Sequence, residues 1–99
     1  METVPIEFLL AEQLTDLDWT LALAESCTGG LISHRVTNVA GASEYYLGGV
    51  VAYSNAAKQH LLGVSQETLD KFGAVSEQTV KEMAQGVKKL FNTQTAIAV

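Results

Sequence analysis

Hydrophobic positions alternate along the chain between two periodicities. Residues 5–18 carry apolar side chains at helical spacing, which predicts a helix with a proline in its first turn. Its apolar positions are Ile6, Leu9, Leu10, Leu14 and Leu17. Residues 19–24 follow as a short apolar run, typical of a buried parallel strand. A second helix is predicted where Leu31, Ile32 and Val36 share one face.

The second half of the chain repeats this alternation. Residues 49–53 form an apolar, partly β-branched run that predicts a second strand. Three helices are expected after it, because serine or asparagine side chains stand where they can cap a helix start. These caps are Ser54 or Asn55, then Ser65, then Ser76. Residues 95–99 predict a third strand.

This order of elements predicts an α/β fold, a three-layer α/β/α arrangement with a mostly parallel sheet. The 99 residues suffice for one domain and show no linker or internal repeat, so residues 1–99 are interpreted as a single domain. The third strand leaves an open sheet edge, and open edges tend to pair with another chain. We therefore expect a homo-oligomer that associates through this strand or through the helices.

Composition and charge narrow the possible partners. The hydrophobic fraction of 47% is typical of a globular protein, and the net charge is −5. The first 25 residues contain six acids and no lysine or arginine, which repels a nucleic-acid backbone. We expect no nucleic-acid binding. A small phosphorylated substrate remains compatible, because local donors in a cleft outweigh a distant net charge.

The location of the protein is predicted from what its chain lacks. Cys27 is the single cysteine, which excludes an internal disulfide and fits a reducing compartment. No apolar run approaches the roughly 20 residues needed to cross a bilayer. The acidic start differs from a signal peptide. These features predict a cytoplasmic protein without membrane contact.

The segment from Ala24 to Gly30 is the first candidate for chemistry. Ser26 would stand at the carboxyl end of its strand, where open α/β sheets bind ligands. Glycines 29 and 30 would let a ligand approach the backbone, and N–H groups at a helix start can bind an oxyanion or a phosphate. A capped strand-to-helix turn without catalytic function explains the same pattern.

Lys58 is the second candidate, just after the second strand. It would lie in the first turn of a helix, where the helix dipole disfavours a cation and favours a neutral amine that can act as a base. An ordinary solvated lysine is the alternative. The catalytic hypothesis is favoured because two parallel strands would bring Ser26 and Lys58 to the same sheet edge.

Other reactive residues receive weaker assignments. Cys27 is a second candidate nucleophile. His34 and His60 lack ligand spacing, so no metal is predicted. Tyr45 and Tyr46 are interpreted as packing residues. The acids of the first helix are interpreted as a solvated face.

Three segments together resemble the CinA C-terminal domain family, which includes the nicotinamide mononucleotide deamidases. They are Glu-Ser-Cys-Thr-Gly-Gly at 25–30, Gly-Val-Val-Ala-Tyr-Ser-Asn-Ala-Ala-Lys at 49–58 and Gly-Ala-Val-Ser-Glu at 73–77. The resemblance implies hydrolysis of the carboxamide of nicotinamide mononucleotide, with no cofactor. It implies that Ser26 attacks the carboxamide carbon, Lys58 takes the proton and Tyr53 orients the lysine. It implies contacts to substrate at Cys27, Thr28, Gly29 and Gly30.

The resemblance also implies a longer domain than this chain provides. Family members continue with a glycine-rich loop after the third strand and with two more strands, so that this chain holds strands 2-1-3 of a five-stranded sheet. A truncated domain of this kind is expected to be weakly active or inactive. The alternative functions are a non-catalytic module that binds a ligand or a protein partner, linked to competence or DNA damage, and an amidase or esterase with another substrate.

Overall fold

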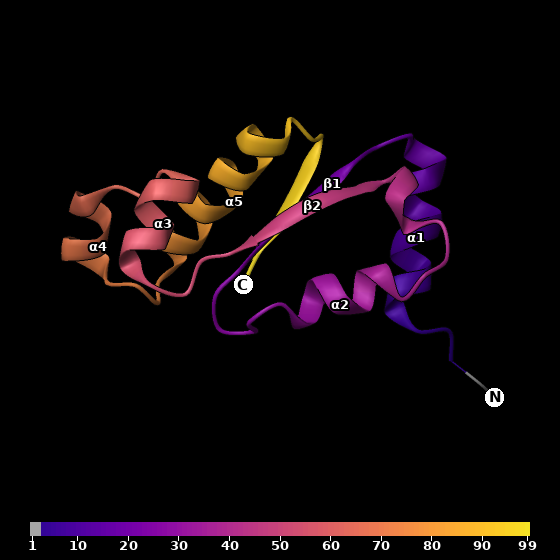
Figure 1. Cartoon of the computed structure of the whole chain (residues 1–99), viewed down its shortest axis with the longest axis horizontal. Helices are drawn as coiled ribbons and strands as arrows, with labels where there is room; N and C mark the ends of the chain where they lie inside the picture. Colours follow the sequence, from indigo (N-terminus) through magenta and orange to yellow (C-terminus); the bar gives the residue numbers. More distant parts are fainter. Residues whose placement is uncertain (1–2) are drawn as a thin grey trace.

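The computed structural model describes residues 3–99; Met1 and Glu2, which belong to the predicted domain, lie outside the described residues. The structure contains one sheet of three parallel strands in the order β2-β1-β3 (Figure 1). The strands are β1 (Leu21–Glu25), β2 (Tyr46–Val51) and β3 (Thr95–Ala98). The predicted α/β class and strand order are confirmed.

The helices cover both faces of this sheet. One face packs against α1 (Ile6–Leu17) and α2 (Leu31–Thr37), which precede the short 3₁₀ helix η1 (Ala42–Glu44). The other face packs against α3 (Asn55–Leu62), α4 (Gln66–Phe72) and α5 (Glu77–Phe91). Consecutive side chains of a strand point to opposite faces, so β1 contributes to both clusters.

Strand β1 is apolar at almost every position because it is buried on both faces. Leu21 and Leu23 belong to the cluster under α1 and α2, while Ala22 and Ala24 belong to the cluster under the later helices. All four are at most 1% exposed. The alanines are small where α5 crosses the sheet, so the helix can approach the strand closely.

Helix starts in the second half follow the predicted capping chemistry. In α3, α4 and α5 a serine hydroxyl accepts a hydrogen bond from the N–H three residues later. The three capping residues are Ser54, Ser65 and Ser76. Gly63 then ends α3 in the left-handed region, with φ of 71°.

The bounds predicted for the second strand are wrong. Strand β2 begins at Tyr46, three residues before the predicted start, and ends at Val51, two residues before the predicted end. Two glycines inside the strand hide its start from the sequence pattern. A Cβ at Gly48, where φ is +153°, would lie 2.6 Å from the Phe91 ring. A Cβ at Gly49 would lie 2.7 Å from the Leu23 carbonyl oxygen. Close packing therefore selects glycine inside this strand.

The apolar face predicted for α1 is only partly buried. Leu14 is 4% exposed, whereas Ile6, Leu9 and Leu17 remain largely accessible. Figure 1 shows α1 at one end of the molecule, where it lies beside α2 and away from α3, α4 and α5. The acids of α1 are not uniformly solvated either, since the side chain of Glu7 is 12% exposed in an ion pair with Arg35.

Parallel strands bring their carboxyl ends to one edge of the sheet. Figure 1 shows the C-terminus, the loop that leads into α2 and the link into α3 on the same side. Two hydrogen bonds join these segments: the N–H of Ser26 donates to the Val99 carbonyl at 2.7 Å, and the N–H of Ala52 donates to the Glu25 carbonyl at 2.8 Å. Within residues 3–99, no helix is long and apolar enough to cross a membrane.

Candidate active site

Ser26 follows directly after β1 and borders a cavity. The residue is half-buried, and the cavity of about 360 Å³ lies between it and the start of α5. The other lining residues are Cys27, Ala74, Val75, Ser76, Glu77, Val80, Met83 and Val99. Both main-chain groups of Ser26 form hydrogen bonds: its N–H donates to the Val99 carbonyl, and its carbonyl accepts from the N–H of Gly29 at 3.2 Å.

The turn after Ser26 presents main-chain donors. Gly29 and Gly30 have φ of 61° and 109°, a region in which a side chain is strained. The N–H groups of Cys27, Thr28 and Gly30 have no hydrogen-bond acceptor within residues 3–99. An anionic oxygen bound at this turn could therefore accept hydrogen bonds from them.

The side chains of this turn differ in their surroundings. The Cys27 thiol is free and exposed beside the cavity. The Thr28 hydroxyl donates to a Glu25 carboxylate oxygen at 2.7 Å, so its hydrogen is already engaged within the protein. Any hydrogen bond that Thr28 donates to a substrate in this arrangement would come from its N–H.

Lys58 is buried, which contradicts the alternative of a solvated lysine. It is 3% exposed, and its Nζ donates to the main-chain carbonyl of Tyr53 at 3.1 Å. Two ion pairs occur in the described part of the chain, Arg35 with Glu7 and Lys81 with Glu77, and Lys58 belongs to neither. The partner of the amine is therefore a neutral main-chain carbonyl and not a carboxylate.

Ser26 and Lys58 follow neighbouring strands whose ends are tied together. Lys58 Nζ bonds to the residue after Ala52, and the N–H of Ala52 bonds to the residue before Ser26. In residues 3–99 no hydrogen bond joins Ser26 Oγ to Lys58 Nζ; the amine faces the Tyr53 carbonyl instead.

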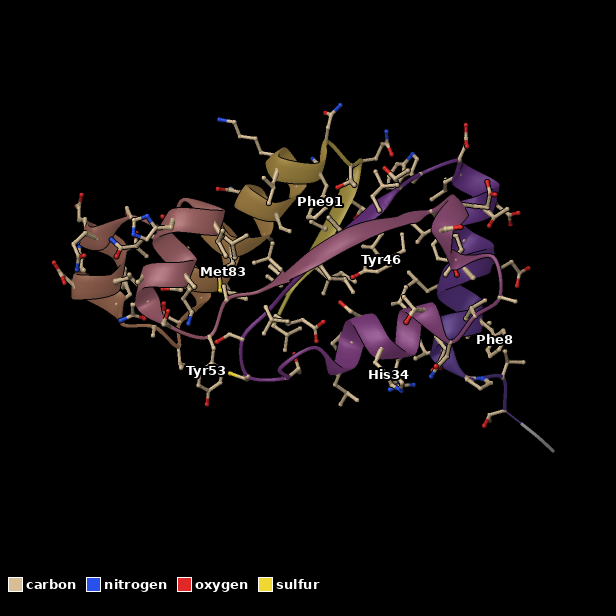
Figure 2. The ribbon with its side chains drawn as sticks, viewed as in Figure 1. Phe8, His34, Tyr46, Tyr53, Met83 and Phe91 are labelled. Atoms are coloured by element: carbon tan, nitrogen blue, oxygen red, sulfur yellow. The ribbon has the colours of Figure 1, made fainter. Side chains whose placement is uncertain are left out.

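Tyr53 contacts Lys58 through its main chain. Its side chain is 77% exposed, and Figure 2 shows the ring directed away from the sheet. The orientation of Lys58 in this structure therefore comes from a carbonyl oxygen and not from the phenol.

Glu25 is the residue that sequence reasoning missed. It ends β1, is 1% exposed and accepts four hydrogen bonds. Burial raises the pKa of this carboxyl, but hydrogen bonds from Ser33, Thr28 and the main chain outweigh it and hold the pKa below its ordinary value. The available signal was an acid at the end of an apolar strand, followed by hydroxyl residues at 28 and 33.

Metal ligands are not gathered at this edge. The described residues contain no group of three or more histidine, cysteine, aspartate or glutamate side chains that could hold a metal ion. His34 is exposed on α2 (Figure 2). The reactive groups that the described structure places at this edge are the Ser26 hydroxyl, the Cys27 thiol, the Lys58 amine and main-chain N–H groups.

Comparisons with known proteins place this geometry in context. A family model described as the CinA C-terminal domain matches residues 4–99. A CinA-like protein from Thermotoga maritima is 52% identical over 94 residues, which cover 95% of this chain and 23% of that protein. A CinA-like protein from Fervidobacterium nodosum is 56% identical over 88 residues, 89% of this chain and 22% of that protein.

Solved structures share the fold. The crystal structure of a competence or damage-inducible protein from Enterobacter asburiae matches with a TM-score of 0.92 and 44% identity, covering 94% of this chain and 58% of that one. A CinA superfamily protein from Escherichia coli matches with a TM-score of 0.91 and 29% identity, covering 99% of this chain and 60% of that one. The chain thus spans about a quarter of the length of its curated relatives and three fifths of these solved chains.

Proposed function

Because this chain belongs to the CinA C-terminal domain family, we propose that it carries the Ser26–Lys58 part of an amidase site for nicotinamide mononucleotide. The products are nicotinate mononucleotide and ammonia. The observation that carries this proposal is Lys58 itself, a buried lysine without an acidic partner at the strand edge that also holds Ser26. An ordinary surface lysine would be exposed to water and not buried at this edge of the sheet.

The proposed reaction begins with the Ser26 hydroxyl. Its Oγ forms a bond to the carboxamide carbon while Lys58 Nζ takes the hydroxyl proton. The carboxamide oxygen becomes an oxyanion, which the unoccupied N–H groups of Cys27, Thr28 and Gly30 can stabilise. The carbon–nitrogen bond then breaks, Lys58 returns its proton to the leaving nitrogen, and water hydrolyses the ester on Ser26.

This reaction requires Lys58 to exchange one hydrogen-bond partner. Its Nζ bonds to the Tyr53 carbonyl in the structure, and the reaction needs Ser26 Oγ within hydrogen-bond reach. A lysine side chain has four rotatable bonds, so the amine can change partner while the backbone stays in place. Catalytic hydrogen bonds often tighten when substrate binds.

Ammonia release from nicotinamide mononucleotide tests the proposal. We would measure it for this chain and for a chimaera that appends the unmatched part of the Enterobacter asburiae protein. Ser26→Ala and Lys58→Ala should each abolish release while substrate binding persists. Cys27→Ser is the matched control and should keep the activity. Loss in Cys27→Ser with normal release in Ser26→Ala would assign the nucleophile to the thiol.

A binding module without catalysis is the second candidate. It is favoured by the hydrogen bonding of Lys58, since its Nζ donates to the Tyr53 carbonyl and no hydrogen bond within residues 3–99 joins it to Ser26 Oγ. Binding of nicotinamide mononucleotide by both proteins, with no ammonia release from either, would support it. Release of ammonia or alcohol from other amides or esters would instead assign a different substrate.

A further inference from the structure

Glu25 holds the turn that carries the candidate nucleophile. One carboxylate oxygen accepts from the N–H of Ile32 at 2.8 Å and from the Thr28 hydroxyl. The other accepts from the N–H of Ser33 at 2.9 Å and from the Ser33 hydroxyl at 2.7 Å. The short hydroxyl contacts are typical of charge-assisted hydrogen bonds.

This arrangement replaces an ordinary helix cap. Gly30 occupies the capping position of α2 and has no side chain to accept a hydrogen bond. The N–H groups of Ile32 and Ser33 are the ones that a capping side chain normally satisfies. Glu25 reaches them from the end of β1, so it joins the strand to the helix across the intervening turn.

The link continues to the neighbouring strand. The Tyr46 hydroxyl donates to Ser33 Oγ at 2.8 Å, and Ser33 Oγ in turn donates to Glu25. Figure 2 shows Tyr46 between the sheet and α2. Gly49 leaves room for this chain of hydroxyls, because a Cβ there would lie 2.8 Å from the Tyr46 oxygen and 3.2 Å from Ser33 Oγ.

We propose that Glu25 is a positioning residue, which fixes the turn from Ser26 to Gly30 so that Oγ and the main-chain donors face one point. The inference rests on the proposed function, because it assigns Ser26 as the nucleophile. Glu25 is adjacent to Ser26 in the chain. Its hydrogen bond from the Thr28 hydroxyl connects the residue before Ser26 with the middle of the turn. Its carboxylate faces α2 and does not act on substrate.

A test that needs no turnover is the reaction of Ser26 with a fluorophosphonate. Ser26 Oγ forms a bond to the phosphorus of the reagent, the P–F bond breaks to release fluoride, and Lys58 takes the proton of the Ser26 hydroxyl. Intact-protein mass spectrometry measures the rate of labelling. In Glu25→Gln an amide N–H₂ would oppose the N–H of Ser33 or Ile32, so the turn shifts. We expect labelling to slow by about 10²-fold, the scale associated with a misplacement of about 1 Å.

The matched control is Glu82→Gln. Glu82 is another hydrogen-bonded carboxylate, which accepts from the N–H of Ser65 at 3.1 Å. Its loss should lower the melting temperature and leave Ser26 labelling unchanged, as expected of a purely structural carboxylate. Wild-type labelling in a folded Glu25→Gln protein would overturn the proposal. If that variant does not fold, Ser33→Ala decides, with slower labelling supporting the proposal and an unchanged rate overturning it.

Failure of the proposed function gives a different result. Ser26 labelling without release of ammonia would refute only the assigned substrate, and Glu25 could still be evaluated. No labelling of Ser26 in the wild-type protein would overturn both proposals, because no nucleophile would remain to be positioned.

Discussion

Lys58 Nζ lies 3.1 Å from the carbonyl oxygen of Tyr53, five residues earlier in the chain and directly after the Ala52 that bonds to β1. The lysine thus reaches back from α3 to the end of the strand before it. This contact places an amine at the carboxyl edge of the sheet, enclosed by protein and without an acid beside it.

Replacement of Lys58 by methionine should separate activity from stability. Methionine has a similar length and removes the buried amine, so the melting temperature should stay equal or rise. Ammonia release should fall by about 10²–10⁴-fold, the usual contribution of a general base. Thermal melting and an ammonia assay measure the two effects. Lys81→Met, at an exposed ion pair, should change neither by much; an active Lys58→Met would contradict the proposed role.

Gly86 should not tolerate a methyl group. In an ordinary helix interior, alanine in place of glycine stabilises by about 0.5–1 kcal/mol. A Cβ at Gly86 would overlap the carbonyl group of Leu62, so α3 and α5 would have to separate. We expect a net loss of about 1–3 kcal/mol in the free energy of unfolding, measured with urea. Gln85→Ala, at an exposed position of the same helix, is the control; a more stable Gly86→Ala would show that the contact yields easily.

Glu25 should make the protein sensitive to acid. Its pKa in the folded protein is below the ordinary value near 4.5, so the unfolded chain binds the proton more readily. The stability that Glu25 contributes is therefore present above about pH 4.5 and lost as the pH falls through the lower folded value. The difference in unfolding free energy between wild type and Glu25→Gln should shrink across this range in denaturant titrations.

The control for acid sensitivity is Glu7→Gln. The hydrogen bond from Arg35 lowers the pKa of Glu7 as well, but this pair lies near the surface. Its pH-dependent contribution should be smaller. An acid dependence that is the same in wild type and Glu25→Gln would contradict the role of the buried carboxylate.

The chimaera proposed above should be more active than the 99-residue chain. The cavity beside Ser26 is lined on one side by α5 and the turn before it, and about two fifths of the Enterobacter asburiae chain has no counterpart in the 99 residues. Extra walls would exclude water and add contacts to substrate. Turnover per Ser26 site, compared for the two proteins, measures the effect; equal rates would refute it.

Local features of the sequence determined most of the secondary structure. Apolar periodicity and the serine caps predicted α3, α4 and α5, because capping depends on groups only three residues apart. The apolar runs predicted β1 and β3, and the order of the elements favoured parallel strands. Ser26 and Lys58 could be selected for the same reason, since each directly follows a predicted strand.

Tertiary structure decided what depends on residues distant in the chain. The burial of Lys58 and Glu25, the early start of β2 and the exposed face of α1 all depend on which surfaces pack together. The local sequence around a charged residue does not show whether water or protein surrounds its side chain. The packing of strands and helices determines which charged side chain is removed from water. The free-energy cost of that burial is offset by hydrogen bonds from residues that lie far away in the sequence.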